Sequence, residues 1–164
     1  MTTRKILLSV VVPCFNEEAV IGLTHRHLVG ALGGNASFDL EIVYVNDGSR
    51  DRTEALLFEL ADRDPRVKVV SFTRNFGHQA AVSAGLQYAD GDAVAVIAAD
   101  LQDPPAAILG LMEKWRGGYG VVHAGRGQRK GGRAERAAHA GFFKLSRPAA
   151  AGGRPSCSGA LAPL

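Results

Sequence analysis

Short apolar runs alternate with helix-forming segments along most of this chain, and this alternation restricts the fold more than any other feature. The runs are mainly apolar and rich in valine and isoleucine, as strands of a buried parallel sheet are. They lie at residues 6–12, 40–45, 67–72 and 93–98, with a shorter run at 119–123. Segments with helical spacing of apolar residues lie at residues 17–32, 51–64, 78–88 and 105–115. The alternation predicts an α/β fold, a doubly wound and mostly parallel sheet with helices on both faces.

The length and composition are those of one globular domain with a small positive net charge. The chain has 164 residues and a net charge of +3, which favours anionic partners; we expect no nucleic acid among them. Two cysteines, Cys14 and Cys157, make no disulfide framework, so a reducing cytoplasmic setting is expected. No signal peptide is expected at the start, and no apolar run approaches the roughly 20 residues of a membrane-spanning helix.

Polar side chains gather where the predicted strands end. In parallel sheets these carboxyl ends share one edge, and ligands bind outside it. The residues concerned are Asn16, Glu17, Asp47, Arg74, Asn75, Asp100 and Asp103. One acidic strand end is commonly a helix cap, whereas a set along one edge indicates a binding site.

The stretch after the fourth run carries the most chemistry. Asp100, Gln102 and Asp103 offer oxygen ligands to a hard divalent cation such as Mg²⁺ or Mn²⁺. Pro104 and Pro105 suit the first turn of the helix that follows. An alternative is that Asp100 and Asp103 only cap that helix.

The composition changes beyond residue 130. Between residues 126 and 164 there are six arginines and two lysines but one glutamate, and glycine, alanine, proline and serine are abundant. We therefore divide the chain into a globular domain at 1–130 and a basic Gly/Ala/Pro-rich tail at 131–164. The tail is expected to be disordered after Pro148, with a short helix possible at 134–145.

Four motifs together resemble one family. They are Val-Pro-Cys-Phe-Asn-Glu at 12–17, Val-Asn-Asp-Gly-Ser at 45–49, Arg-Asn-Phe-Gly-His-Gln at 74–79 and Ala-Asp-Leu-Gln-Asp-Pro-Pro at 99–105. Over residues 6–130 the chain resembles family 2 glycosyltransferases, above all the polyprenyl-phosphate (dolichol-phosphate) hexose synthases. The resemblance implies a GT-A fold with a Rossmann-like nucleotide half and an acceptor half. It implies a metal-dependent, inverting transfer of a hexose from a UDP- or GDP-sugar to a polyprenyl phosphate.

The resemblance also implies roles for nucleotide-binding residues. Pro13, Phe15, Glu17 and Asp47 correspond to residues that hold the base and ribose. Asp100 is expected on the donor side as well.

The metal and the acceptor are assigned in the same way. Asp100 corresponds to the second aspartate of the family's metal motif, and Gln102 to the polar residue two positions on. Asp100 and Asp103 are the predicted catalytic carboxylates, with Mg²⁺ or Mn²⁺ as cofactor. Arg126 and Arg129 correspond to basic residues on the acceptor-phosphate side.

Two departures from the family pattern stand out. Ala98 occupies the place of the first aspartate in the family's Asp-Ala-Asp motif, which gives Asp103 more weight. The sequence after about residue 130 does not resemble the family, many members of which continue into membrane helices. We expect a truncated or frameshifted chain, attached peripherally at the inner face of the plasma membrane.

Two other functions were weighed. One is a nucleotide- or sugar-binding fragment without turnover. The other is a dinucleotide-binding Rossmann protein, which is disfavoured because the first strand ends in Pro-Cys-Phe-Asn-Glu and not in a G-x-G-x-x-G loop.

Overall fold

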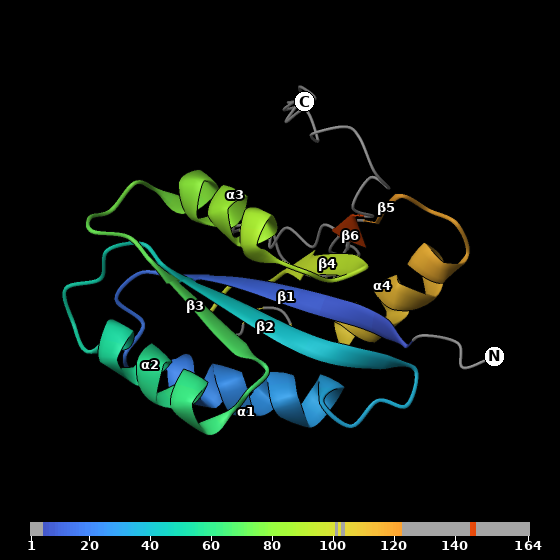
Figure 1. Cartoon of the computed structure of the whole chain (residues 1–164), viewed down its shortest axis with the longest axis horizontal. Helices are drawn as coiled ribbons and strands as arrows, with labels where there is room; N and C mark the ends of the chain where they lie inside the picture. The colour runs from blue at the N-terminus through green and yellow to red at the C-terminus, as the bar shows by residue number, and fades with distance from the viewer. Residues whose placement is uncertain (1–4, 101, 103, 123–144, 147–164) are drawn as a thin grey trace, which may run out of the picture.

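The structure, a computed structural model, describes residues 5–100, 102, 104–122 and 145–146. Strands and helices alternate along the chain (Figure 1). The strands are β1 (Ile6–Cys14), β2 (Phe38–Asn46), β3 (Val67–Ser71), β4 (Ala93–Val96), β5 (Val121–Val122) and β6 (Leu145–Ser146). The helices are α1 (Ile21–Leu32), α2 (Thr53–Arg63), α3 (His78–Tyr88) and α4 (Ala107–Arg116). None of the helices in these ranges is long and apolar enough to cross a membrane.

The strands form one sheet in the order β3-β2-β1-β4-β6-β5. Strands β1 to β4 are parallel, whereas β6 runs antiparallel to both β4 and β5. The predicted mostly parallel sheet is therefore confirmed. The helix considered possible at 134–145 is wrong at Leu145, which lies in β6, and its other residues lie outside the described ranges.

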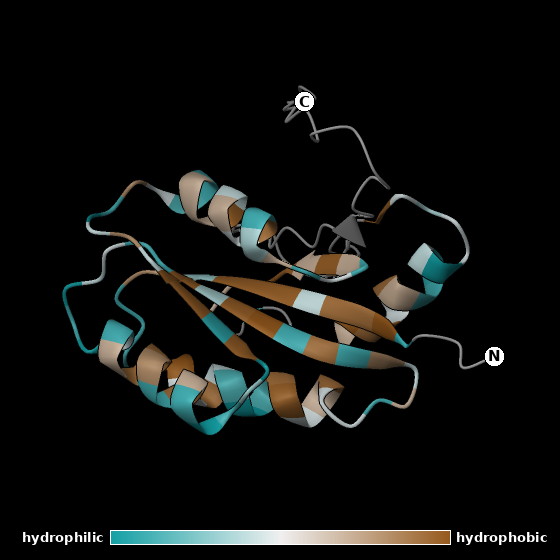
Figure 2. Cartoon of the chain, viewed as in Figure 1, coloured by the Kyte–Doolittle hydropathy of each residue, from teal (hydrophilic) through white to brown (hydrophobic). Residues whose placement is uncertain are grey.

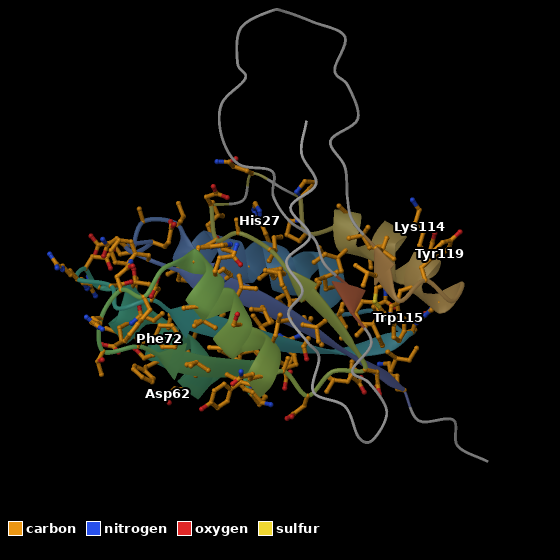
Figure 3. The ribbon with its side chains drawn as sticks, turned by 90° about the horizontal axis from the view of Figure 1, so that it is seen from above. His27, Asp62, Phe72, Lys114, Trp115 and Tyr119 are labelled. Atoms are coloured by element: carbon orange, nitrogen blue, oxygen red, sulfur yellow. The ribbon has the colours of Figure 1, made fainter. Side chains whose placement is uncertain are left out.

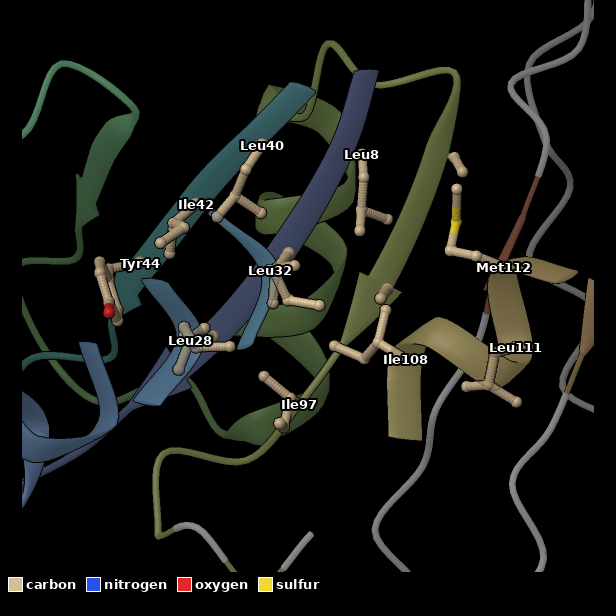
Figure 4. Close-up of a cluster of buried hydrophobic side chains, with 14 of the residues drawn as sticks. Leu8, Leu28, Leu32, Leu40, Ile42, Tyr44, Ile97, Ile108, Leu111 and Met112 are labelled. Atoms are coloured by element: carbon tan, nitrogen blue, oxygen red, sulfur yellow. The ribbon is translucent and has the colours of Figure 1, made fainter. Parts of the chain in front are cut away.

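Helices cover both faces of the sheet, as the alternation predicted. Helix α3 lies on one face, and α1, α2 and α4 lie on the other (Figure 1). Alternate residues of β1 point to opposite faces, so Leu8 and Val10 pack with α1 and α4, while Val11 packs under α3. Figure 4 shows Leu8 among the side chains of the first of these clusters. Figure 2 shows the result, apolar strands between helices whose outer surfaces are polar.

Besides α2, which begins at Thr53 and not at residue 51, two helices begin later than predicted. Helix α1 begins at Ile21 and not at Glu17, whose backbone N–H donates to the Thr53 side chain. Helix α4 begins at Ala107, after the two prolines. Both shifts leave polar loop residues free to line the sheet edge.

Asp51 and Glu54 have the sequence spacing of a capping box, but no capping box forms at the start of α2. Asp51 Oδ1 accepts the N–H of Thr53 at 2.9 Å, but the N-cap residue is Arg52, and no side chain caps the helix. Glu54 Oε1 accepts the Ser71 hydroxyl of β3 and does not turn back to the helix start. The Glu54 carboxylate thus bonds to a residue of β3 in place of a backbone N–H at the start of its own helix.

Helix α3 packs so closely on the sheet that Gly85 has no room for a side chain. A Cβ at this position would lie 2.2 Å from Val11 Cγ1 and 3.1 Å from Val45 Cγ2. Gly30 of α1, by contrast, has no atom within 4 Å of the position of its Cβ.

We predict opposite effects of alanine at these two glycines. Gly85→Ala should lower the free energy of unfolding by about 1–2 kcal/mol, because overpacking outweighs the better helix propensity of alanine. Gly30→Ala should raise it by up to about 1 kcal/mol, because only the propensity changes. Urea unfolding of both variants measures the difference. A Gly85→Ala protein as stable as Gly30→Ala would contradict the close packing.

Candidate functional site

The carboxyl ends of the parallel strands meet at one edge of the sheet. Cys14, Asn46 and Ser71, the last residues of β1, β2 and β3, are partners in the strand register. The loops that leave these strands therefore lie side by side, at the left of Figure 1. This is the edge at which the sequence predicted a site.

The first two loops are joined by reciprocal hydrogen bonds between residues 16–18 and 49–53, which we call the loop clasp. Each loop donates backbone N–H groups to side chains of the other. The bonds are Asn16 N to Ser49 Oγ (3.0 Å), Glu17 N to Thr53 Oγ1 (2.7 Å), Glu18 N to Asp51 Oδ2 (3.1 Å), Arg50 N to Asn16 Oδ1 (2.8 Å) and Arg52 N to Glu18 Oε2 (2.9 Å). The clasp holds the Glu17 backbone in place before any ligand arrives.

Asp47 connects the second loop to the third. Its side chain is buried, and its two carboxylate oxygens accept the N–H groups of Phe76 (2.7 Å) and Gly77 (3.0 Å) at the start of α3. The predicted nucleotide contact of Asp47 thus comes with a structural role. The carboxylate shapes the loop that carries Arg74 and Phe76.

Between these loops lies a hollow of about 350 Å³. Its walls combine aromatic rings, arginines and polar groups. They are Phe15, Asn46, Gly48, Ser49, Arg50, Glu54, Phe72, Thr73, Arg74 and Asn75. Phe72 lies near one end of the molecule, and Trp115 and Tyr119 lie near the other (Figure 3). The hollow is therefore far from α4.

Aromatic and cationic groups flank the hollow on the β3 side. The rings of Phe72 and Phe76 meet edge to face at 5.5 Å, and the Arg74 guanidinium lies 4.6 Å above the centre of the Phe76 ring. Both Arg74 and Phe76 are exposed. A planar, polar ligand would find both stacking surfaces and hydrogen-bond donors here.

Carboxylates gather on the β1 and β4 side of the same edge. Burial raises the pKa of Glu17, and the nearby carboxylates of Asp100 and Asp51 raise it further. Asp100 itself is exposed, and its Oδ1 accepts the N–H of the exposed Gln102 at 3.2 Å. Glu17 and Asp100, predicted from separate motifs, are thus close enough to repel each other.

The oxygen ligands on this side suit a cation that is held partly by the protein and partly by the phosphates of a substrate. Within the described residues there is no group of three or more histidine, cysteine, aspartate or glutamate side chains that could hold a metal. Mg²⁺ commonly binds through one or two carboxylates plus substrate phosphates, keeping several waters. The exposed carboxylate of Asp100, with the Gln102 amide oxygen beside it in sequence, suits that mode.

The other predicted site residues fall in several places. Phe15 lines the hollow, whereas Pro13 is buried within β1 in register with Val45. Asp103, Arg126 and Arg129 lie outside the described residues.

The hollow also includes residues that were not proposed as ligands. These are Asn46, Gly48, Ser49, Arg50, Glu54, Phe72 and Thr73, whereas Arg74 and Asn75 belong to the strand-end set that the sequence predicted. Most of them lie in or next to the motifs at 45–49 and 74–79, and that proximity is the signal that could have identified them.

The fold is the GT-A arrangement, a Rossmann-like parallel sheet that carries its loops at one edge. The sequence model of Glycosyl transferase family 2 matches residues 9–162, past residue 130 where the predicted domain ends. The chain belongs to glycosyl transferase family 2, as its motifs predicted.

Two curated relatives and one solved structure illustrate the similarity. A Bacillus subtilis (strain 168) protein named uncharacterized glycosyltransferase YkcC is 50% identical over 129 residues, 79% of this chain and 40% of the relative. The prophage bactoprenol glucosyl transferase homolog of Escherichia coli (strain K12) is 45% identical over 139 residues, 84% of this chain and 45% of the relative. The mannosyltransferase PcManGT from Pyrobaculum calidifontis, solved with GDP-Man and Mn²⁺, has a TM-score of 0.60 at 26% identity, covering 73% of this chain and 34% of that one. The chain thus spans less than half the length of these proteins.

Glu17 gives the site a measurable pH dependence. A carboxyl group with a raised pKa in the folded state favours folding most below its unfolded pKa, near 4.5, and this contribution is lost as the pH rises through the folded pKa. We therefore expect Glu17→Gln to be more stable than the wild type at neutral pH and equal to it below about pH 4. Urea unfolding across this pH range tests the sign.

Glu113 provides the matched control for this experiment. It is exposed on α4, far from the loop clasp. Glu113→Gln should follow the wild type across the series. A Glu17→Gln protein that is less stable than the wild type at neutral pH would show that the ionised carboxylate is favourable in its site.

Proposed function

We propose that this chain carries the donor-binding half of a glycosyltransferase that moves a hexose from a UDP- or GDP-sugar to a polyprenyl phosphate, with inversion. The observation that carries the proposal is the convergence of the strand-end loops of a family 2 chain on one hollow and one carboxylate pair. Names of relatives support the class of reaction. One relative is a bactoprenol glucosyl transferase homolog, and one structural neighbour binds GDP-Man.

The nucleotide would occupy the edge above β1, β2 and β3. Phe15 and Arg74 line the hollow there, and Asp47 lies beneath the loop that forms its wall. The carboxylate oxygens of Asp47, which already accept two backbone N–H groups at the start of α3, would also accept hydrogen bonds from base N–H or ribose hydroxyl groups. Pro13 and Glu17 complete the proposed nucleotide-binding set.

The pyrophosphate of the donor would lie toward Asp100. Glu17, Asp51 and Asp100 make this side of the edge acidic, so a pyrophosphate needs a counter-charge in order to bind. Asp100 and Gln102 would hold Mg²⁺ or Mn²⁺ there, with Asp103 as a second catalytic carboxylate. When bound, the cation neutralises the charge that develops on the leaving group.

The acceptor side is assigned from the basic residues near the end of the predicted domain. A lipid phosphate is already ionised near neutral pH, so the attack depends less on a strong general base than attack by an alcohol does. Arg126 and Arg129 would orient that phosphate by charge-assisted hydrogen bonds. On this proposal the protein acts in the cytoplasm, peripherally at the inner face of the plasma membrane.

A second candidate is a binding domain without turnover. It is favoured by one observation, that Ala98 stands in the place of the first aspartate of the family's metal motif, which removes one metal-site carboxylate. Both candidates predict metal-dependent nucleotide binding, and only the transferase predicts release of UDP or GDP in the presence of acceptor lipid.

Asp100 and Asp47 should respond differently to mutation. Asp100→Asn should remove the gain in UDP or GDP affinity that Mn²⁺ provides, roughly ten- to a hundredfold, and leave metal-free binding unchanged. Asp47→Ala should weaken binding with and without metal, because its proposed contacts go to base or ribose. Calorimetric titration of each nucleotide measures both.

Asp39→Asn is the control for these two variants. Asp39 is exposed and pairs with Lys5 at 2.7 Å, at the opposite end of β2. It should bind like the wild type. An Asp100→Asn protein with an unchanged response to Mn²⁺ would refute the metal assignment.

Membrane attachment through the basic segment is also testable. Each basic residue near an anionic surface contributes about 1 kcal/mol, so the eight arginines and lysines after residue 125 can give weak, salt-sensitive binding. We expect sedimentation with phosphatidylglycerol vesicles at low salt and release at about 1 M salt, where the Debye length is about 3 Å. Binding that persists at high salt would indicate hydrophobic insertion, and none at low salt would refute the attachment.

A further inference from the structure

Asp100 follows a part of the chain that has already left the sheet. Strand β4 ends at Val96, and the last backbone bond to β1 is donated by Ile97 N–H to the Val11 carbonyl at 3.0 Å. Ala98 and Ala99 then carry the chain to Asp100. A carboxylate that must meet a ligand in a defined geometry needs further support at this point.

That support comes from α1. The hydroxyl of Thr24, in the first turn of the helix, donates to the Ala99 carbonyl oxygen at 2.6 Å. Thr24 is fully buried and Ala99 is 3% exposed, so water does not compete for this bond. The two residues are 75 positions apart in the chain, which makes this a tertiary contact and not a helix cap.

The geometry favours Ala99 as the acceptor over the nearer partner in sequence. Thr24 Oγ1 also lies 3.0 Å from the Val20 carbonyl oxygen, an ordinary contact for a threonine in a helix. That carbonyl already accepts the backbone N–H groups of Leu23 and Thr24, at 2.9 Å each. A hydroxyl has one proton to donate, and the shorter contact is to Ala99.

We propose that Thr24 is a positioning residue that fixes the backbone immediately before Asp100, and so the place of the Asp100 carboxylate. The inference rests on the proposed role of Asp100 in binding a metal–nucleotide complex. The Thr24 hydrogen bond also accounts for how Asp100 keeps its position near Glu17, because the two carboxylates at this edge of the sheet repel each other. The Thr24 hydrogen bond and the repulsion from Glu17 therefore act on the same segment, Ala99 and Asp100.

The test compares three variants of α1 in the full chain. Thr24→Val removes the hydroxyl and keeps the branched shape, Thr24→Ser keeps the hydroxyl, and Leu28→Ala weakens the buried face of the same helix away from the site. UDP and GDP are titrated calorimetrically with and without Mn²⁺, and ¹H–¹⁵N spectra are recorded without metal. We expect Thr24→Val to reduce the Mn²⁺-dependent gain in affinity about tenfold and to leave metal-free affinity unchanged.

The controls separate positioning from a general loss of stability. Thr24→Ser should restore the gain, and Leu28→Ala should retain it while lowering the midpoint of unfolding. The amide signals of Asp100 and Gln102 should move in Thr24→Val and stay in place in Thr24→Ser. A reduction of the gain in Leu28→Ala equal to that in Thr24→Val, or no rescue by serine, would overturn the positioning role.

Asp100→Asn distinguishes this inference from the function on which it rests. If Asp100→Asn loses the gain and Thr24→Val keeps it, the positioning role is wrong and the proposed function stands. If Asp100→Asn keeps the gain, or the wild type has none, the metal assignment fails and the role of Thr24 fails with it.

Discussion

The site depends on the parallel register of β1 with its two neighbours. β1 pairs with β2 over nine residues, from Ile6 opposite Phe38 to Cys14 opposite Asn46, and with β4 through Val11 opposite Val96. A slip of one residue would exchange the side chains that face α3 for those that face α1 and α4. Because both faces are tightly packed, as Gly85 shows, the register is strongly specified. The loops that follow these strands then leave the sheet side by side.

The buried carboxylates Glu41 and Asp64 are paired within the protein, whereas the exposed carboxylate of Asp100 is open to a ligand. Glu41, buried in β2, accepts the Ser9 hydroxyl and the Asp90 N–H and pairs with Lys68. Asp64, at the end of α2, is held by the Arg66 guanidinium through two hydrogen bonds, which lowers its pKa. These groups are paired because an unpaired buried charge is costly. Asp100 is exposed at the sheet edge, where a ligand can supply the compensating charge.

The loops of the site are organised before a ligand binds. The loop clasp joins the first two loops, and Asp47 joins the second to the third. Thr24 connects α1 to the segment that leads to Asp100. Each connection pairs a side chain with a backbone group of another loop or strand, so the ordering entropy is lost on folding and not on binding. Such preorganisation suits the binding of a flexible, charged nucleotide-sugar that we propose for this edge.

The amino-acid sequence by itself determined the strand–helix alternation, the mostly parallel sheet, the edge that carries the site and the family. These follow from local periodicity and short motifs, and α3 agrees with its prediction at both ends. Only the tertiary structure decided which groups act together. The Asp47 bonds to the β3–α3 loop, the Ser71 partner of Glu54 and the Thr24 bond to Ala99 all join residues distant in the chain. No local pattern encodes such partners, because they exist only after the strands have fixed which loops are neighbours.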